Sequence, residues 1–170
     1  THQPNTCIAY EVCHRCIQEP IHEPCVVCGE KRRHVFKGVN TNEEFCKWLF
    51  NGDHSTCICF AHNASGYDNL FILDYVYSHG IKAKPLLTGT KVMTMKICGL
   101  KFLDSLKFFP MPLSALPKAF GKQELKKGWF PHKFNTWENQ NYIGPYPAPG
   151  FYMPEVMSTE KRQEFLAWYD

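Results

Sequence analysis

The chain has 170 residues, a formal net charge of +3, and a composition that is 44% hydrophobic and 15% aromatic. This length suits one domain, or one domain with an appendage, and the apolar fraction is enough for a sizeable core. No apolar run approaches the ~20 residues of a membrane-spanning helix, so we expect no membrane partner. The mild charge permits nucleic-acid binding without requiring it. Because the chain begins with Thr1 and ends at Asp170 within a helical pattern, we expect both ends to be truncated.

Alternating apolar residues predict a strand over residues 8–12, and a second strand is predicted over residues 34–37. Between them lie four of the nine cysteines, in the pairs Cys13-x-x-Cys16 and Cys25-x-x-Cys28. Two such pairs can supply four thiolates to a tetrahedral Zn²⁺ ion, and a four-thiolate site is structural because it has no open position. We therefore predict a zinc loop at residues 13–28 that staples the two strands.

Other interpretations of these cysteines stay open. Only eight residues separate the pairs, fewer than in the common four-cysteine pattern, and His14, His22 or His34 could replace one cysteine. Two disulfides or free thiols are further alternatives. The remaining five cysteines are single and lie in apolar contexts, and the total is odd. Both observations favour a reducing compartment, and hence metal over disulfides.

The next part of the chain predicts a sheet packed by helices. Residues 41–44 read as a capping box that begins a helix carrying Phe45, Trp48 and Leu49. The further elements, in chain order, are a strand ending at Phe60, a helix at 67–78, two or three strands within 86–103 with turns at Gly89 and Gly99, a short helix at 113–120, a long ordered loop at 129–154, and a last helix capped by Ser158. This order indicates a mixed α/β or α+β fold.

The most informative segment joins the strand that ends at Phe60 to the helix at 67–78. It contains Asn63, Tyr67 and Asp68, and we expect Gly66 to allow the sharp bend. Asp68 at such a turn could hold a metal ion, or could cap the helix that follows. Asp104 at the end of the last strand offers the same choice between a metal ligand and a turn or cap.

A basic and aromatic segment follows the sheet. Lysines alternate there with large aromatic residues, as in surfaces that track a nucleic-acid backbone and stack its bases. A solvated lysine face is the alternative. The residues are Lys118, Lys122, Lys126, Lys127 and Lys133 with Phe120, Trp129, Phe130 and Phe134.

Together these motifs resemble family B DNA polymerases. Asn63-x-x-x-Tyr67-Asp68 is similar to the second exonuclease motif of that family, and residues 103–109 resemble the Ser-Leu single-strand-binding motif of its protein-primed branch. The order of residues 116–121, 125–132, 139–144 and 157–158, with the cysteine pairs, is similar to polymerases of Polinton or Maverick-type DNA transposons.

The resemblance implies a partial exonuclease domain over residues 1–170, with a ribonuclease H-like fold and a small Cys-rich zinc-loop insertion. It implies two-metal 3′–5′ proofreading, in which Mg²⁺ or Mn²⁺ ions are held by four carboxylates. Asp68 would be one of the four, and Lys127 would stabilise the charge of the scissile phosphate. The DNA-binding residues would be Asn63, Tyr67, Ser105, Leu106 and, beside Lys127, Lys126. The implied partners are a single-stranded 3′ end, the rest of the polymerase and a terminal priming protein, in an intracellular, nuclear location.

Two motifs of the family are missing from the chain. It contains neither Asp-x-Glu, the first exonuclease motif, nor Tyr-x-x-x-Asp, the third, and it has no polymerase motif. We therefore expect the chain alone neither to degrade nor to extend DNA. The alternative is a non-catalytic, zinc-stapled nucleic-acid-binding module derived from such a polymerase.

Overall fold

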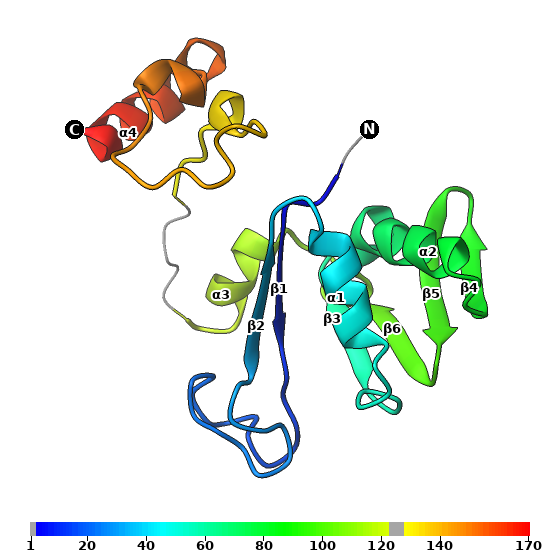
Figure 1. The fold of residues 1–170 in the computed structure, drawn as a ribbon. Coiled ribbons are helices and arrows are strands. Elements are labelled where there is room, and N and C mark those ends of the chain that lie inside the picture. Colours follow the sequence, from blue (N-terminus) through cyan, green and yellow to red (C-terminus); the bar gives the residue numbers. More distant parts are fainter. Residues whose placement is uncertain (1–2, 123–127) are drawn as a thin grey trace. The chain divides into compact units, whose positions relative to one another are not determined.

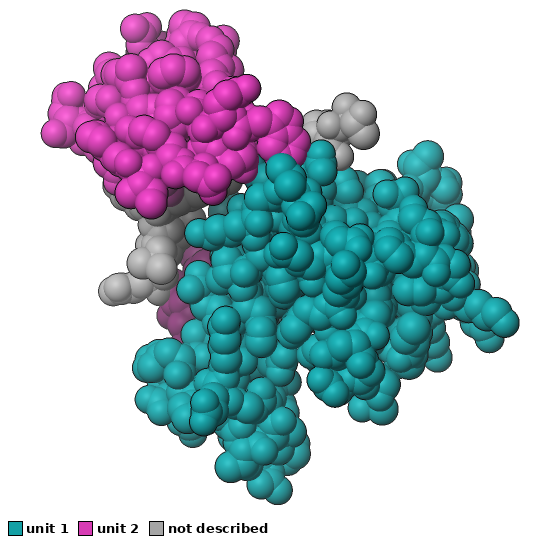
Figure 2. All heavy atoms as spheres, viewed as in Figure 1, with its two compact units in different colours: residues 1–116 teal, residues 117–170 magenta. Residues whose placement is uncertain are grey.

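The computed structural model describes residues 3–122 and 128–170 (Figure 1). The chain forms two compact units, residues 1–116 and residues 117–170, which Figure 2 draws in different colours. The expected partial domain thus consists of two parts, each of which packs mainly on itself.

A four-stranded mixed sheet forms the centre of the first unit. Its strands are β3 (Ile58–Ala61), β4 (Ala83–Thr88), β5 (Lys91–Ile97) and β6 (Leu100–Asp104), in the spatial order β3-β6-β5-β4. β3 runs parallel to β6, and the other two pairings are antiparallel. The predicted strands and the turns at Gly89 and Gly99 are confirmed, because both glycines have positive φ between paired strands.

Two helices, α1 (Thr41–Leu49) and α2 (Asp68–Ser78), bury apolar side chains against this sheet. The shared core includes Cys46, Val76, Met95, Ile97 and Phe102. Two side-chain amides strengthen the packing, since Asn42 donates to Phe71 O and the buried Asn69 donates to Val92 O. Among the described residues, no helix combines the length and the apolar character needed to cross a membrane.

The start of α1 differs from the expected capping box. Thr41 is the first residue of the helix and is fully buried, and no side chain caps the helix at Asn40. The Thr41 hydroxyl instead donates a hydrogen bond to Gly38 O at 2.8 Å. The predicted cap was one residue too late, because the N-cap position is Asn40 and Thr41 is already in the helix. Gly38, with φ of +91°, turns the chain so that its carbonyl is the partner of the Thr41 hydroxyl.

A two-stranded antiparallel hairpin, β1 (Thr6–Tyr10) with β2 (Arg33–Lys37), carries the cysteine loop at its tip. One face of the hairpin packs on α1, where Phe36 lies 5.5 Å from Phe45 and 5.6 Å from Trp48 between ring centroids. The predicted pair of strands on either side of the loop is therefore confirmed.

The second unit has little regular structure, as expected for residues 129–154. It contains α4 (Thr159–Tyr169), which Ser158 caps as predicted by accepting from Lys161 N, and the turns His132–Phe134, Pro149–Tyr152 and Pro154–Val156. The completely buried Phe165 forms its centre, with Trp129 and Tyr152 packed around it. The short helix expected at 113–120 is divided into a turn at Leu113–Ala115 and α3 (Leu116–Ala119).

We expect Gly99→Ala to lower the free energy of unfolding of the first unit by about 3 kcal/mol. Gly99 has φ of +85°, and an added Cβ would lie 2.5 Å from Ser55 O. Gly89→Ala is the matched control, since φ there is +57° but nothing lies within 4 Å, and its expected cost is about 1 kcal/mol. Urea unfolding followed by circular dichroism measures both, and equal losses would contradict the close approach to Ser55.

Candidate functional site

The segment from Asn63 to Asp68 lies at the carboxyl ends of two parallel strands. Ala61, the last residue of β3, is in register with Asp104, the last residue of β6. After β3 the chain turns through Asn63 in a left-handed conformation with φ of 61°, and Gly66 is not the residue that requires positive φ. The sharp bend expected at Gly66 lies instead at Asn63, a residue type that tolerates the left-handed conformation, and the lack of a Cβ at Gly66 leaves room for the Asn63 amide, which a Cβ would meet at 3.3 Å.

Asp104 holds this turn in place. Its Oδ1 accepts hydrogen bonds from Asn63 N at 2.8 Å and Leu106 N at 3.0 Å, and its Oδ2 accepts from Ser65 N at 3.0 Å. The residue is 3% exposed, and burial alone would raise its pKa. The hydrogen bonds from Ser65, Leu106 and Asn63 outweigh burial and hold the pKa of Asp104 below its ordinary value. Asp104 therefore anchors the turn, and three backbone N–H groups occupy most of its acceptor capacity.

Asp68 is the first residue of α2 and is exposed to solvent. The N-cap position of this helix is Tyr67, and no side chain caps it. Asp68 is therefore not the capping residue that the sequence allowed as an alternative to a metal ligand. Surrounding protein atoms raise the pKa of Asp68 by partial desolvation, and the negative charge of Asp104 raises it further. A carboxylate destabilised in this way gains from a nearby cation.

An open hollow of about 580 Å³ lies beside the turn. Its lining residues are His62, Asn63, Leu106 and Pro110 to Leu113. Two predicted DNA-binding residues, Asn63 and Leu106, thus come together on one surface although they are 43 positions apart in the sequence. Tyr67 is 46% exposed and packs edge-on against Phe71 at 4.8 Å.

His62 lines the hollow, and Ser105 lies behind it. Ser105 is buried, and its hydroxyl lies 2.9 Å from His62 Nδ1. His62 Nε2 lies 3.0 Å from Met111 O and donates to it, so in the neutral ring Nδ1 accepts from Ser105. His62 was expected to be structural, and this pairing with Met111, 49 residues away, gave no signal in the sequence.

The structure describes only some residues of the basic and aromatic segment. Lys126 and Lys127 lie outside the described residues. Of the other members of the basic and aromatic segment, Trp129 packs on Phe165 in the core of the second unit, and Lys133 forms an ion pair with Glu155 at 3.0 Å. Phe120 and Phe130 remain more than half exposed.

The four predicted zinc ligands come together. The Sγ atoms of Cys13, Cys16, Cys25 and Cys28 lie within 4.8 Å of one another, and three of the pairs are 3.7 Å apart. Four sulfurs at about 2.3 Å from a central zinc in a tetrahedron lie about 3.8 Å apart, so the site fits Zn²⁺. None of the nine cysteines, all of them in the described part of the chain, forms a disulfide. The cluster contains no histidine.

Backbone amides also support the cluster. Cys16 Sγ accepts from Cys13 N at 3.3 Å, and Cys25 Sγ accepts from Val27 N at 3.4 Å. Such hydrogen bonds, those of Cys28 and Val27 first, lower the pKa of Cys25 to about 6. Burial and the neighbouring thiols of Cys13 and Cys16 raise the pKa of Cys28 to about 12, so a bound cation would be needed to hold all four groups as thiolates.

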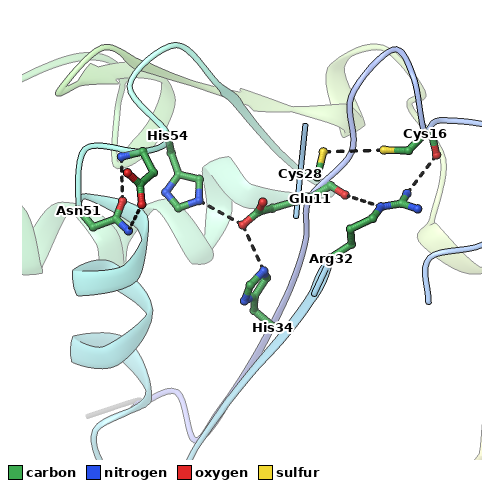
Figure 3. Close-up of polar contacts among 8 residues, drawn as sticks. Glu11, Cys16, Cys28, Arg32, His34, Asn51 and His54 are labelled. Carbon is green, nitrogen blue, oxygen red and sulfur yellow. Dashed lines mark hydrogen bonds and ion pairs between the residues drawn. The ribbon is translucent and has the colours of Figure 1, made fainter. Parts of the chain in front are cut away.

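Arg32 ties the cysteine loop to the hairpin (Figure 3). It is 2% exposed, and its guanidinium donates to four carbonyl oxygens, those of Glu11, Cys16, Pro20 and Glu23. Beside it, the Glu11 carboxylate bridges two imidazoles that were not singled out as a pair in the sequence. His34 Nε2 lies 3.1 Å and His54 Nε2 3.2 Å from Glu11 Oε1. Both rings pack on Trp48.

A magnesium site is not complete among the described residues. The cysteine cluster is the only group of three or more potential ligands there, and Asp68 is a single carboxylate. Asp104 is engaged by backbone N–H groups. The residues present therefore do not by themselves fit a two-metal centre.

The zinc site can be tested by metal content. We expect the purified chain to carry about one zinc per molecule and Cys16→Ser to lose it, because three thiolates bind the ion far more weakly. Cys57→Ser is the control, since Cys57 is exposed and outside the cluster. Mass spectrometry measures the zinc, and protein prepared without chelator that contains none would contradict the site.

We expect Asp104→Asn to lower the free energy of unfolding by about 2 kcal/mol, because an amide offers one acceptor oxygen where the carboxylate offers two. The lowered pKa of Asp104 means that its contribution is present above its ordinary value of 3.8 and is lost as the pH falls through the folded-state value. Urea titrations from neutral to acidic pH measure this.

The variant should lack that part of the acid dependence. Asp74→Asn, on an exposed position of α2, is the control and should leave both stability and acid dependence unchanged. An Asp104→Asn protein with the stability and acid profile of the parent would rule out the anchoring role.

Comparisons with known proteins bear on the whole arrangement. A family described as DNA polymerase type B, organellar and viral, matches residues 51–166, a range that contains the Asn63 to Asp68 turn and Asp104 but not the cysteine loop. No solved structure matches the chain.

Three curated relatives are each called a probable DNA polymerase. The relative from Agaricus bitorquis is 30% identical over 109 residues, which are 61% of this chain and 14% of the relative. Those from Ascobolus immersus and Neurospora intermedia are 35% and 30% identical, over 52% and 62% of this chain and 8% and 12% of their own lengths. The chain thus spans a small part of these relatives. Since the family match covers more than half of the chain, the chain belongs to the DNA polymerase type B family of organellar and viral type.

Proposed function

We infer that the chain contributes the strand-binding part, and one metal-binding carboxylate, of a 3′–5′ proofreading exonuclease in a protein-primed DNA polymerase. The observation that carries this proposal is the anchored turn. Asp104 fixes residues 63–65, a turn that lines the open hollow at Asn63 and leads five residues later to the exposed Asp68 at the start of α2. Parallel strands that present polar turns at their carboxyl ends, as β3 and β6 do, are a common setting for substrate sites in α/β folds.

Each site residue has a proposed part. Asn63 and Leu106 line the hollow and would contact the frayed 3′ end, and the exposed ring of Tyr67 would stack on a base. Ser105 is buried behind them, so its part would be to hold His62 and the edge of the hollow rather than to meet the strand directly. Lys127, with Lys126, would stabilise the phosphate charge, a role that comes from the family resemblance alone.

The remaining carboxylates would come from elsewhere in the protein. β3 pairs with β6 along one edge, and no described strand pairs with its other edge; β1 likewise has one unpaired edge. Burial and the charge of Asp68 raise the pKa of Cys7, on β1, to about 11, so β1 lies within electrostatic reach of Asp68. A strand added between these edges would complete a ribonuclease H-like sheet and bring its carboxylates toward Asp68.

Divalent ions bound by such a set would activate water and stabilise the attacking and leaving oxygens. The chain's own residues would hold the strand end and keep Asp68 in position. The zinc loop would be structural, because four thiolates leave no open coordination position. DNA polymerase activity, a terminal priming protein and a nuclear location belong to the same proposal for the whole protein.

In the complete polymerase we expect Asp68→Asn to slow release of nucleotides from a single-stranded 3′ end by about 100-fold or more. Extension of a matched primer should stay within about twofold, because Asp68 has no part in the polymerase chemistry. Gel assays of labelled primers measure both rates. Asp74→Asn, another exposed aspartate on α2, should leave both unchanged.

The complete protein, rather than the chain alone, separates this proposal from the zinc-stapled binding module. Neither an incomplete exonuclease nor a binding module releases nucleotides, but only the complete polymerase should gain a nuclease that depends on Asp68. Release by the chain alone that Asp68→Ala leaves unaltered would show that the site lies elsewhere. A complete protein without Asp68-dependent nuclease would favour the binding module.

A further inference from the structure

A row of three lysines crosses the outer face of the four-stranded sheet. Lys84 of β4 pairs directly with Lys96 of β5, and Lys96 pairs directly with Lys101 of β6. Paired residues point to the same face, so the three side chains stand side by side, about 5 Å apart from strand to strand. All three are exposed, on the side away from the core residues Met95, Ile97 and Phe102.

This row is unfavourable in the isolated unit. Like charges directly opposite one another in a sheet are destabilising. Within the described part of the chain, none of the three lysines forms an ion pair. The only acidic residue in the four strands is Asp104, which is buried and bonded to the turn. The outer face therefore has a positive charge that no residue of the sheet compensates, and it is complementary to a polyanion.

The row leads to an exposed aromatic pair. Lys101 is in register with Ile58, and Phe60, two residues further along β3, points to the same face. Phe60 stacks on Phe108 with ring centroids 5.8 Å apart, yet the two residues are 55% and 58% exposed. A pair of phenylalanines left this open is typical of a surface that receives a partner.

We propose that the outer face of β3-β6-β5-β4 is a track for single-stranded DNA, in which Lys84, Lys96 and Lys101 contact the phosphates and Phe60 with Phe108 stacks a base. The direction of the track toward the hollow at Asn63 rests on the proposed exonuclease function, since Phe60 and Phe108 each lie within three residues of a lining residue. Adjacent positive and aromatic groups fit a single strand, whose bases are free to stack. The bases of a duplex are already stacked on one another, and an acidic protein segment would pair with the lysines without stacking on the aromatic pair.

The test uses the zinc-loaded chain of 170 residues and a fluorescent oligothymidylate, with binding followed by anisotropy over a range of salt concentrations. The triple variant Lys84→Gln, Lys96→Gln, Lys101→Gln should bind roughly tenfold more weakly and lose about 2 from the slope of log affinity against log salt. The control Lys31→Gln, Lys37→Gln, Lys161→Gln removes the same charge from exposed positions elsewhere and should stay within about twofold of the parent.

Thermal unfolding excludes a trivial cause for lost binding. The row variant should unfold at the same or a higher temperature than the parent, because the repulsion between lysines is relieved. Equal losses in the row and control variants, unchanged binding by the row variant, or tighter binding of duplex than of single strand would each overturn the proposal.

The aromatic pair has its own test. Phe60→Leu should weaken oligothymidylate binding about tenfold, and Phe60→Tyr, which keeps a ring, should not. Identical affinities for the two variants would remove the stacking role.

A closed single-stranded circle separates this inference from the proposed function. The track needs no 3′ end, so the circle should bind, and the lysine row should matter for it as for the linear strand. A lysine effect without any preference for linear DNA would contradict the exonuclease end site alone. A preference for linear DNA without a lysine effect would contradict the track alone.

Discussion

The carboxylate of Asp104 is the contact on which the functional edge of this fold depends. It ends β6, and it receives backbone N–H groups from Asn63 and Ser65 after β3 and from Leu106 in its own turn. Two loops that leave adjacent parallel strands are thereby fixed to one another. The start of α2, the exposed Asp68 and the hollow between Asn63 and Leu106 follow from that connection.

Arg32 fixes the cysteine loop as Asp104 fixes the turn, but with a buried positive charge in place of a negative one. A buried guanidinium there donates to four carbonyls, as the buried carboxylate of Asp104 accepts from three N–H groups. Neither charge has a side-chain counter-ion in these contacts, and backbone N–H or C=O groups make the hydrogen bonds described above. Buried charges are tolerated only when hydrogen bonds replace their hydration, so each loop can take only the shape that satisfies its charge. A zinc tetrathiolate would carry two negative charges, which the cation of Arg32 would partly offset.

The two sites differ in how readily a sequence reveals them. The zinc cluster was predictable because its ligands are close in sequence and two Cys-x-x-Cys pairs permit few arrangements. The strands, the glycine turns and α2 followed from periodicity for the same local reason. The Asn63 to Asp68 turn was found from its pattern, but its geometry was not: the left-handed residue is Asn63, and Thr41 begins α1 instead of capping it. At the Asn63 turn and at the start of α1, contacts with a neighbouring side chain or carbonyl decided the conformation, and not the local propensity of Gly66 or Thr41.

By itself, the sequence determined the family, the mixed α/β class, the four-cysteine cluster and the position of the turn before Asp68, because each depends on short spacings and residue types. Only the tertiary structure decided that Asp104 anchors the turn, since that depends on backbone donors 39 and 41 residues away. It also decided that the buried Ser105 pairs with His62 at the hollow and that three lysines from three strands form one row. Strand register and burial create these neighbours, and neither can be read from the local pattern of the chain.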